Sequence, residues 1–119
     1  MITVKTFIEK LNLRLLTNHE ADEEISVQGC YLGDLLLNVM AKAKEGDVWI
    51  TVMTNPNVVA VAQLINLPAV IILEGHQPMP MTLEKANIEH IPVFSSEESA
   101  YEMAVSFHQS HFTEQKASL

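Results

Sequence analysis

The spacing of apolar side chains predicts that short helices and strands alternate along the chain. Near the amino terminus, four apolar residues keep the i, i+3, i+4, i+7 spacing of an amphipathic helix: Val4, Phe7, Ile8 and Leu11. Thr3 precedes them and can act as the N-cap. Further helices are expected at 34–44, from 57 to about 65, at 82–89, and from 95 to about 111.

Particular residues are expected to start these helices. Asn55 can cap the helix that begins at Pro56, because proline has no N–H to leave unpaired at the first helical position. Thr82 can cap the next helix. Ser95 and Glu98 have the spacing of a capping box for the last one.

Strands are expected where short runs of β-branched or aromatic residues stand between turn signals. The run AVIIL at 69–73 is apolar without alternation, which is typical of a parallel strand covered on both faces. Other strands are expected at 13–16, 24–28, 47–52 and 91–94. Because strands and helices alternate, we expect the α/β class: a three-layer α/β/α single domain with a mainly parallel central sheet.

The length of the chain fits one domain. With 119 residues and 48% hydrophobic composition, it can bury a single core. We expect a domain at 1–112. Residues 113–119 lack an apolar face and are expected to form a frayed C-terminal tail.

Charge and composition exclude some partners. Seven basic and fifteen acidic residues give a net charge of −8, which disfavours nucleic acid and anionic membranes. The most apolar stretch, Leu64 to Leu73, falls below the roughly 18 residues of a membrane span. A single cysteine, Cys30, allows no internal disulfide. We therefore expect a soluble, cytoplasmic protein.

The segment GCYLGDLL, Gly29 to Leu36, has two interpretations. It could cradle a phosphate, but a P-loop needs a lysine after its second glycine, and here Asp34 would repel the anion. We expect a tight strand-to-helix turn, in which Gly29 and Gly33 permit close backbone geometry and Asp34 caps the helix. A weak anion or ligand site is the alternative.

Ligands of parallel α/β sheets collect at the carboxyl ends of the strands. Helix N-termini there could hold a small anion or a nucleotide phosphate without lysine. The loops expected at this edge supply the candidate ligand-binding residues: Gly29, Cys30, Gly33, Asp34, Thr54, Asn55, Asn57, Gly75 and His76.

No catalytic or metal-binding constellation is evident. Cys30 could be a nucleophile at a helix start, but no His and Asn or Asp partner stands out. His108 and His111 lie three apart on the last expected helix, and two ligands do not make a metal site. The acidic cluster at 22–24 is interpreted as a solvated loop. We expect no cofactor, no metal and no catalytic residue.

Two stretches, VQGCYLGDLLLNVMAKAKEGDVWITV and NVVAVAQLINLPAVIILEG, resemble the DRTGG domain family and, more distantly, the N-terminal domain of HPr kinase/phosphorylase. The resemblance covers residues 1 to about 110, although the Asp-Arg-Thr-Gly-Gly string is missing. It implies a regulatory or interaction module without kinase activity, since phosphoryl transfer in that kinase belongs to a separate P-loop domain.

These observations favour a non-catalytic regulatory domain. We expect a homodimer, since two-fold dimers are the commonest oligomers, with a possible small ligand such as a nucleotide or phosphorylated metabolite at the strand-end loops. The alternatives are a small enzyme that uses Cys30 or His76, and a docking subunit for a larger metabolic enzyme.

Overall fold

The computed structural model describes residues 2–18 and 26–117. Its helices are α1 (Val4–Leu11), α2 (Leu36–Lys42), α3 (Asn57–Leu64), α4 (Pro80–Glu89) and α5 (Ala100–Ala117). Its strands are β1 (Ile2–Thr3), β2 (Arg14–Leu15), β3 (Ser26–Val27), β4 (Gly29–Leu32), β5 (Asp47–Thr51), β6 (Val70–Ile72) and β7 (Val93–Ser95).

A five-stranded sheet in the order β2-β7-β6-β5-β4 forms the centre of the molecule. β4, β5, β6 and β7 are mutually parallel, and β2 pairs antiparallel with β7 at one edge. β1 and β3 form a separate antiparallel pair. The mainly parallel sheet expected from the sequence is confirmed.

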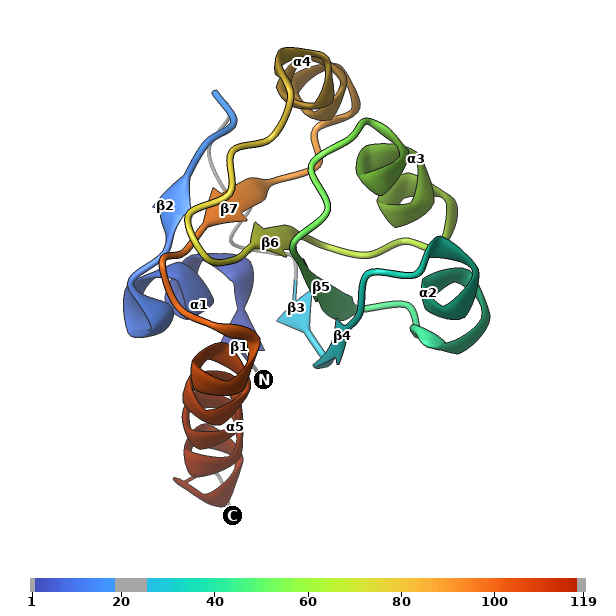
Figure 1. Cartoon of the computed structure of the whole chain (residues 1–119). Helices are drawn as coiled ribbons and strands as arrows, with labels where there is room; N and C mark the ends of the chain where they lie inside the picture. Colours follow the sequence, from blue (N-terminus) through green and yellow to red (C-terminus); the bar gives the residue numbers. More distant parts are fainter. Residues whose placement is uncertain (1, 19–25, 118–119) are drawn as a thin grey trace.

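Helices cover both faces of the sheet (Figure 1). α2, α3 and α4 follow β4, β5 and β6 and lie on the same face, as right-handed crossovers between successive parallel strands require. α1 and α5 cover the other face. Successive side chains of β5 point to opposite faces of the sheet. Trp49 packs against α2 and α3, whereas Val48 and Ile50 pack against α1 and α5. The three-layer α/β/α architecture is confirmed.

The helix starts agree only in part with the sequence-based expectations. Thr3 caps α1, since its hydroxyl accepts from the backbone N–H of Thr6 at 3.2 Å. The predicted Thr82 cap is wrong, because α4 already begins at Pro80, whose missing N–H suits the first turn.

The predicted capping box of α5 is displaced. Ser95 belongs to β7, where it pairs with Ile72 of β6. Ser99 and Glu102 form the box instead: Ser99 N–H donates to Glu102 Oε1 at 3.1 Å, and Glu102 N–H donates to Ser99 Oγ at 3.2 Å. Ser95 with Glu98 and Ser99 with Glu102 both fit the capping-box pattern. Because Ser95 pairs within the sheet, the helix starts at the second of these pairs.

α5 continues to Ala117, so the end predicted near His111 is wrong. Glu114, Gln115, Lys116 and Ala117 are good helix formers, and they extend the backbone helix without an apolar face. The division at residue 112 stays a prediction. The acidic segment at 22–24 lies outside the described residues.

Candidate functional site

The strand-to-helix turn predicted for GCYLGDLL lies later than expected, because residues 29–32 form β4 and residues 33–35 connect it to α2. Gly29 lies beside Asp47 and Cys30 beside Val48 at the amino ends of β4 and β5. A Cβ on Gly29 would lie 2.9 Å from Asp47 Oδ1, which explains the glycine by close approach. Gly29 and Cys30 therefore do not belong to the carboxyl-end edge with the other candidates.

Gly33 and Asp34 do follow the carboxyl end of β4, where they hold the strand ends together. Gly33 N–H donates to Ile50 O at 3.1 Å. Asp34 Oδ1 accepts from Thr51 Oγ1 at 2.7 Å and from Val52 N–H at 2.9 Å. The predicted helix cap is wrong, since Leu35 occupies the N-cap of α2 without a side-chain hydrogen bond.

The loop after β5 carries the next group of candidates, and its polar groups bind one another. Asn55 Oδ1 accepts from Asn57 N–H at 2.9 Å. The predicted position of the cap is wrong by one residue, because Pro56 occupies the N-cap and α3 begins at Asn57. Thr54 O accepts from Met79 N–H at 3.0 Å and from Thr82 Oγ1 at 2.6 Å. These bonds join the start of α3 to the start of α4.

Gly75 and His76 follow β6. Gly75 has a φ of 69°, a left-handed conformation that favours glycine. Its N–H donates to Ser96 O at 3.0 Å, which ties this loop to the loop after β7. The His76 side chain is exposed. The carboxyl-end edge thus assembles the predicted residues Gly33, Asp34, Thr54, Asn55, Asn57, Gly75 and His76 from three loops.

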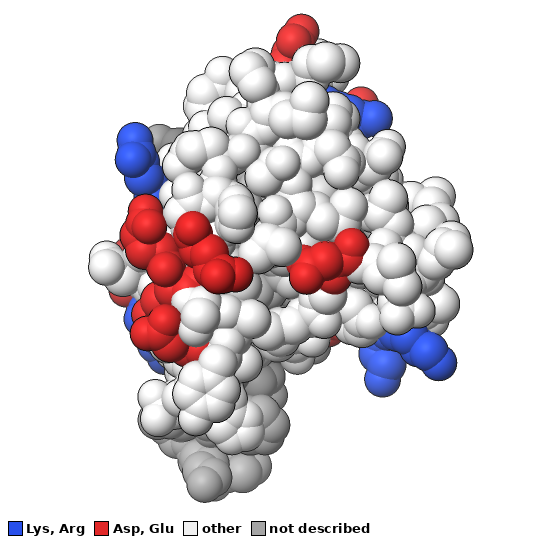
Figure 2. Space-filling model, viewed as in Figure 1, with Lys and Arg blue, Asp and Glu red and all other residues white. Residues whose placement is uncertain are grey.

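A small crevice lies at this edge beside the carboxyl end of β7. β6 leads to α4 on one face and β7 leads to α5 on the other, so the connections diverge here as they do at ligand sites of open α/β sheets. The crevice measures about 240 Å³ and is lined by Leu11, Asn12, Arg14, Gln77, Ser95, Ser96, Glu97 and Glu98. Acidic side chains gather over the adjoining β7–α5 loop (Figure 2).

Cys30 does not have the properties of a nucleophile. Its side chain points to the α1 and α5 face and packs against that core. Burial, with a smaller contribution from the charge of Asp47, raises the pKa of the Cys30 thiol to about 11. Because the thiolate is the reactive form, the environment suppresses nucleophilic chemistry at this residue.

The histidines and acidic residues do not converge either. Among the described residues, no group of three or more His, Cys, Asp or Glu side chains could hold a metal ion. His108 is exposed on α5, and the side chain of His111 lies outside the described part. Within residues 2–18 and 26–117, no helix has the length and apolarity to cross a bilayer.

A larger cleft opens at the opposite edge, beside the amino ends of β5, β6 and β7. It measures about 600 Å³, within the usual range of small-molecule sites. Its lining comprises Ser26, Gln28, Glu45, Gly46, Ala62, Gln63, Asn66, Leu67, Pro68 and Ile91. We call this the amino-end cleft. Sequence reasoning missed it because the usual rule for parallel sheets directs attention to the other edge.

Two tight turns shape the amino-end cleft. Gly46 has a φ of 90° and Asn66 a φ of 57°, and Gly46 N–H donates to Asn66 O at 3.2 Å. Gln28 N–H in turn donates to Gly46 O at 2.9 Å. The connection before β4 and the turns before β5 and β6 are therefore joined by backbone bonds. The sequence does indicate these two turns, because glycine and asparagine adopt the left-handed conformation more readily than other residues.

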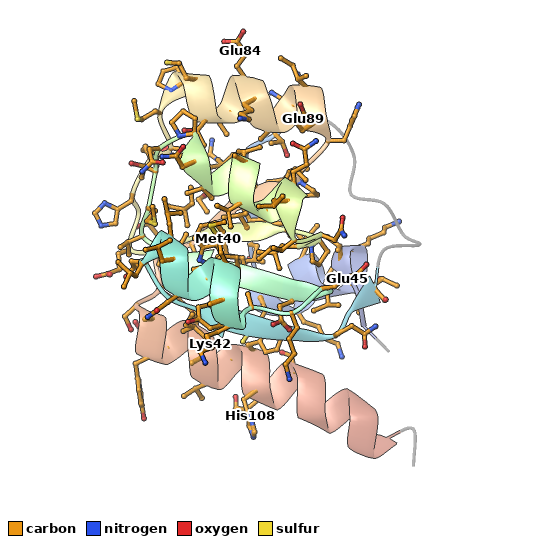
Figure 3. All side chains as sticks on the ribbon, turned by 90° about the vertical axis from the view of Figure 1, so that its right-hand side faces the viewer. Met40, Lys42, Glu45, Glu84, Glu89 and His108 are labelled. Carbon is orange, nitrogen blue, oxygen red and sulfur yellow. The ribbon has the colours of Figure 1, made fainter. Side chains whose placement is uncertain are left out.

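The described lining of the amino-end cleft is mostly uncharged and includes several side chains that can hydrogen-bond. Among the residues that the structure describes, Glu45 is the one ionisable residue of its lining. Gln63 Nε2 donates to Glu89 Oε2 at 2.6 Å, so a second carboxylate lies behind one wall. Glu45 and Glu89 lie at the same edge of the molecule (Figure 3). The described lining thus offers amide and carboxylate groups that can hydrogen-bond.

Comparisons with known proteins bear on the fold. No protein-family model matches the chain, and no curated protein matches it. A solved structure of the CBS and DRTGG domains of the regulatory region of Clostridium perfringens pyrophosphatase, complexed with its activator diadenosine tetraphosphate, is similar with a TM-score of 0.71 and 15% identity. The match covers 91% of this chain and 46% of that chain, so the chain spans about half of that structure. The likeness shows a shared fold.

Proposed function

We propose that this protein is a non-catalytic regulatory domain of the DRTGG type that binds a small molecule. The observation that carries the proposal is the amino-end cleft, which has the size of a ligand site. Its described lining contains one ionisable residue, Glu45. A site of this composition can recognise a molecule by shape and hydrogen bonds without transforming it. The high pKa of the Cys30 thiol supports a non-catalytic role, because it disfavours the reactive thiolate.

The structural neighbour supports a regulatory role. That protein's region is regulatory, and its activator is a nucleotide, diadenosine tetraphosphate. Nucleotides and nucleosides are therefore the first ligand class to test on this chain. The predicted residues at the carboxyl-end edge, with the crevice of about 240 Å³ beside Gly75 and His76, are a second proposed site.

A thermal-shift screen tests ligand binding. A ligand at about 100 times its dissociation constant stabilises the native state by about 2.7 kcal/mol, which raises the melting temperature measurably. We expect at least one nucleoside or nucleotide to do so and to be recovered unchanged by chromatography. Turnover of the bound compound would contradict the non-catalytic role, and the absence of any shift would contradict ligand binding.

The protein is also proposed to form a homodimer. α2 and α3 lie side by side (Figure 1) and expose large apolar side chains. Leu37 is 76% exposed, Leu64 is 66% exposed, and Met40 is 42% exposed. A second copy related by a two-fold axis would cover these residues with the same residues of its own.

Sedimentation velocity at about 50 µM tests the dimer, with Leu37→Glu as the interface variant and Glu84→Ala, on the outer surface of α4, as the control. We expect a dimer for the native chain and the control, and a monomer for Leu37→Glu. A monomeric native chain would contradict self-association.

A docking role is the second candidate function. It is favoured by the acidic surface over the β7–α5 loop (Figure 2), which suits a basic protein partner.

A further inference from the structure

The floor and walls of the amino-end cleft differ in chemistry. Apolar side chains form the floor: Ala62, Leu67, Pro68 and Ile91. Ala62 and Leu67 are buried and belong to the core, so this floor is fixed. Amide side chains stand above it: Gln28, Gln63 and Asn66. A flat ring with polar edges would satisfy both surfaces, whereas a simple amine or phosphate would leave the apolar floor uncovered.

The charge distribution of the cleft favours hydrogen-bond donors over anions. Within the described part of the chain, its lining includes the carboxylate of Glu45 and no lysine or arginine. α2 and α3 both end on this side, and helix C-termini carry partial negative charge. Lys42 lies on the side of α2 that faces α5 (Figure 3). A phosphate group in the cleft would therefore meet the carboxylate of Glu45 and the partly negative ends of α2 and α3.

Gln63 presents a defined hydrogen-bonding edge. A carboxylate only accepts hydrogen bonds, so the bond of 2.6 Å to Glu89 Oε2 requires that the Nε2 end of the Gln63 amide faces Glu89. In this orientation the Gln63 Oε1 can accept a hydrogen bond from a ligand, and the second N–H of Nε2 can donate one. An amide held in this way resembles the groups that recognise the edge of a nucleobase.

We infer that the amino-end cleft binds the base of a nucleoside and disfavours a phosphate-bearing form of it. The inference rests on the proposed ligand-binding function and names the ligand class. The ring lies on the floor around Leu67, and its N–H donors reach Gln63 and Glu45. The carboxylate of Glu45 then discriminates against a nearby phosphate by charge repulsion.

Isothermal titration with adenosine, guanosine and AMP tests this assignment on the full chain. We expect one nucleoside to bind, and in the adenosine series AMP to bind about ten times more weakly than adenosine. Gln63→Ala removes one hydrogen-bonding group and should weaken nucleoside binding about tenfold. Glu45→Gln keeps the shape of the side chain, and it should reduce the preference for adenosine over AMP.

Glu84→Ala, on the outer surface of α4, is the control and should bind as the native chain does. His76→Ala, at the opposite edge of the sheet, removes a side chain of the second proposed site and so distinguishes the two sites. If His76→Ala loses nucleoside binding while Gln63→Ala keeps it, the assignment to this cleft is overturned and ligand binding itself stands. If AMP binds as tightly as adenosine, the predicted discrimination is overturned. If none of the three compounds binds, the inference fails, and the wider thermal-shift screen decides the proposed function separately. Circular dichroism checks that each variant is folded.

Discussion

The Asp34 carboxylate accepts a hydrogen bond of 2.7 Å from the Thr51 hydroxyl and so joins the end of β4 to the end of β5. Asp34 Oδ1 also accepts from Val52 N–H at 2.9 Å. Thr51 is only 1% exposed, so its hydroxyl has little access to water as an alternative partner. This aspartate therefore holds the sheet edge together and does not cap the next helix.

Asp34→Ala should destabilise the fold by about 1–3 kcal/mol, because it leaves the Thr51 hydroxyl without its acceptor. Urea unfolding followed by Trp49 fluorescence measures the change. The control, Glu84→Ala, removes an exposed carboxylate that points away from the molecule (Figure 3) and should change stability by less than about 0.5 kcal/mol. Equal effects of the two changes would contradict the role of Asp34.

Gly46→Ala should destabilise the protein by about 1–3 kcal/mol, because Gly46 has a φ of 90° that strains any residue with a Cβ. The new Cβ would also lie 2.5 Å from Gln28 Cγ. Gly33→Ala is the comparison, since its Cβ would meet only the Tyr31 ring, at 3.0 Å. Urea unfolding should show the larger loss for Gly46→Ala, and the reverse order would count against the turn geometry of the amino-end cleft.

Cys30 should react slowly with iodoacetamide at neutral pH. With a pKa of about 11, about one thiol in ten thousand is ionised at pH 7. The rate should rise about tenfold for each pH unit toward that value, as measured by mass spectrometry. Urea-unfolded protein serves as the control and should react much faster at pH 7. Fast labelling of the native chain would support a reactive cysteine.

The same thiol predicts a loss of stability at alkaline pH. The folded pKa of about 11 lies above the ordinary value of 9.0, so below pH 9 the thiol is protonated in both states and adds no pH dependence. Between about pH 9 and pH 11 the unfolded state releases the proton first, and the free energy of unfolding should fall. Cys30→Ala should show a shallower fall over this range. Identical curves would contradict the raised pKa.

Ser99→Ala should destabilise the start of α5 by about 0.5–2 kcal/mol, since Ser99 caps this helix. Ser95→Ala, at the position that the sequence first suggests, should cost less. The hydrogen bonds from Ser99 lower the pKa of the Glu102 carboxyl. Their stabilising effect is thus present above the ordinary pKa of Glu102 and lost as pH falls through the lowered one. A larger loss for Ser95→Ala in urea unfolding would contradict this assignment.

Local signals predicted the elements better than their ends. The run at 69–73 was correctly assigned as a buried strand because its β-branched composition leaves few alternatives. The two overlapping capping boxes that begin at Ser95 and Ser99 fit the sequence equally well, and only pairing with β6 distinguishes them. The glycines of GCYLGDLL likewise suit a turn or a strand, and the decision depends on β5, a distant segment.

The candidate site was harder to predict from the sequence than the fold. The amino-end cleft draws on four separate segments, around Gln28, Gly46, Asn66 and Ile91, and none of them carries a motif. Their proximity follows from the order of the parallel strands, which the sequence alone left open at the edges. The predicted carboxyl-end loops do assemble, and several of their polar groups form hydrogen bonds between or within these loops.

Chemical-shift mapping by amide NMR, with adenosine and guanosine as titrants, locates a bound nucleoside on the chain. We predict saturable shifts of the Gly46, Asn66 and Leu67 amides, small shifts at Gly75 and His76, and unchanged nucleoside after incubation. Shifts confined to Gly75 and His76, or conversion of the nucleoside to a product, would contradict this prediction.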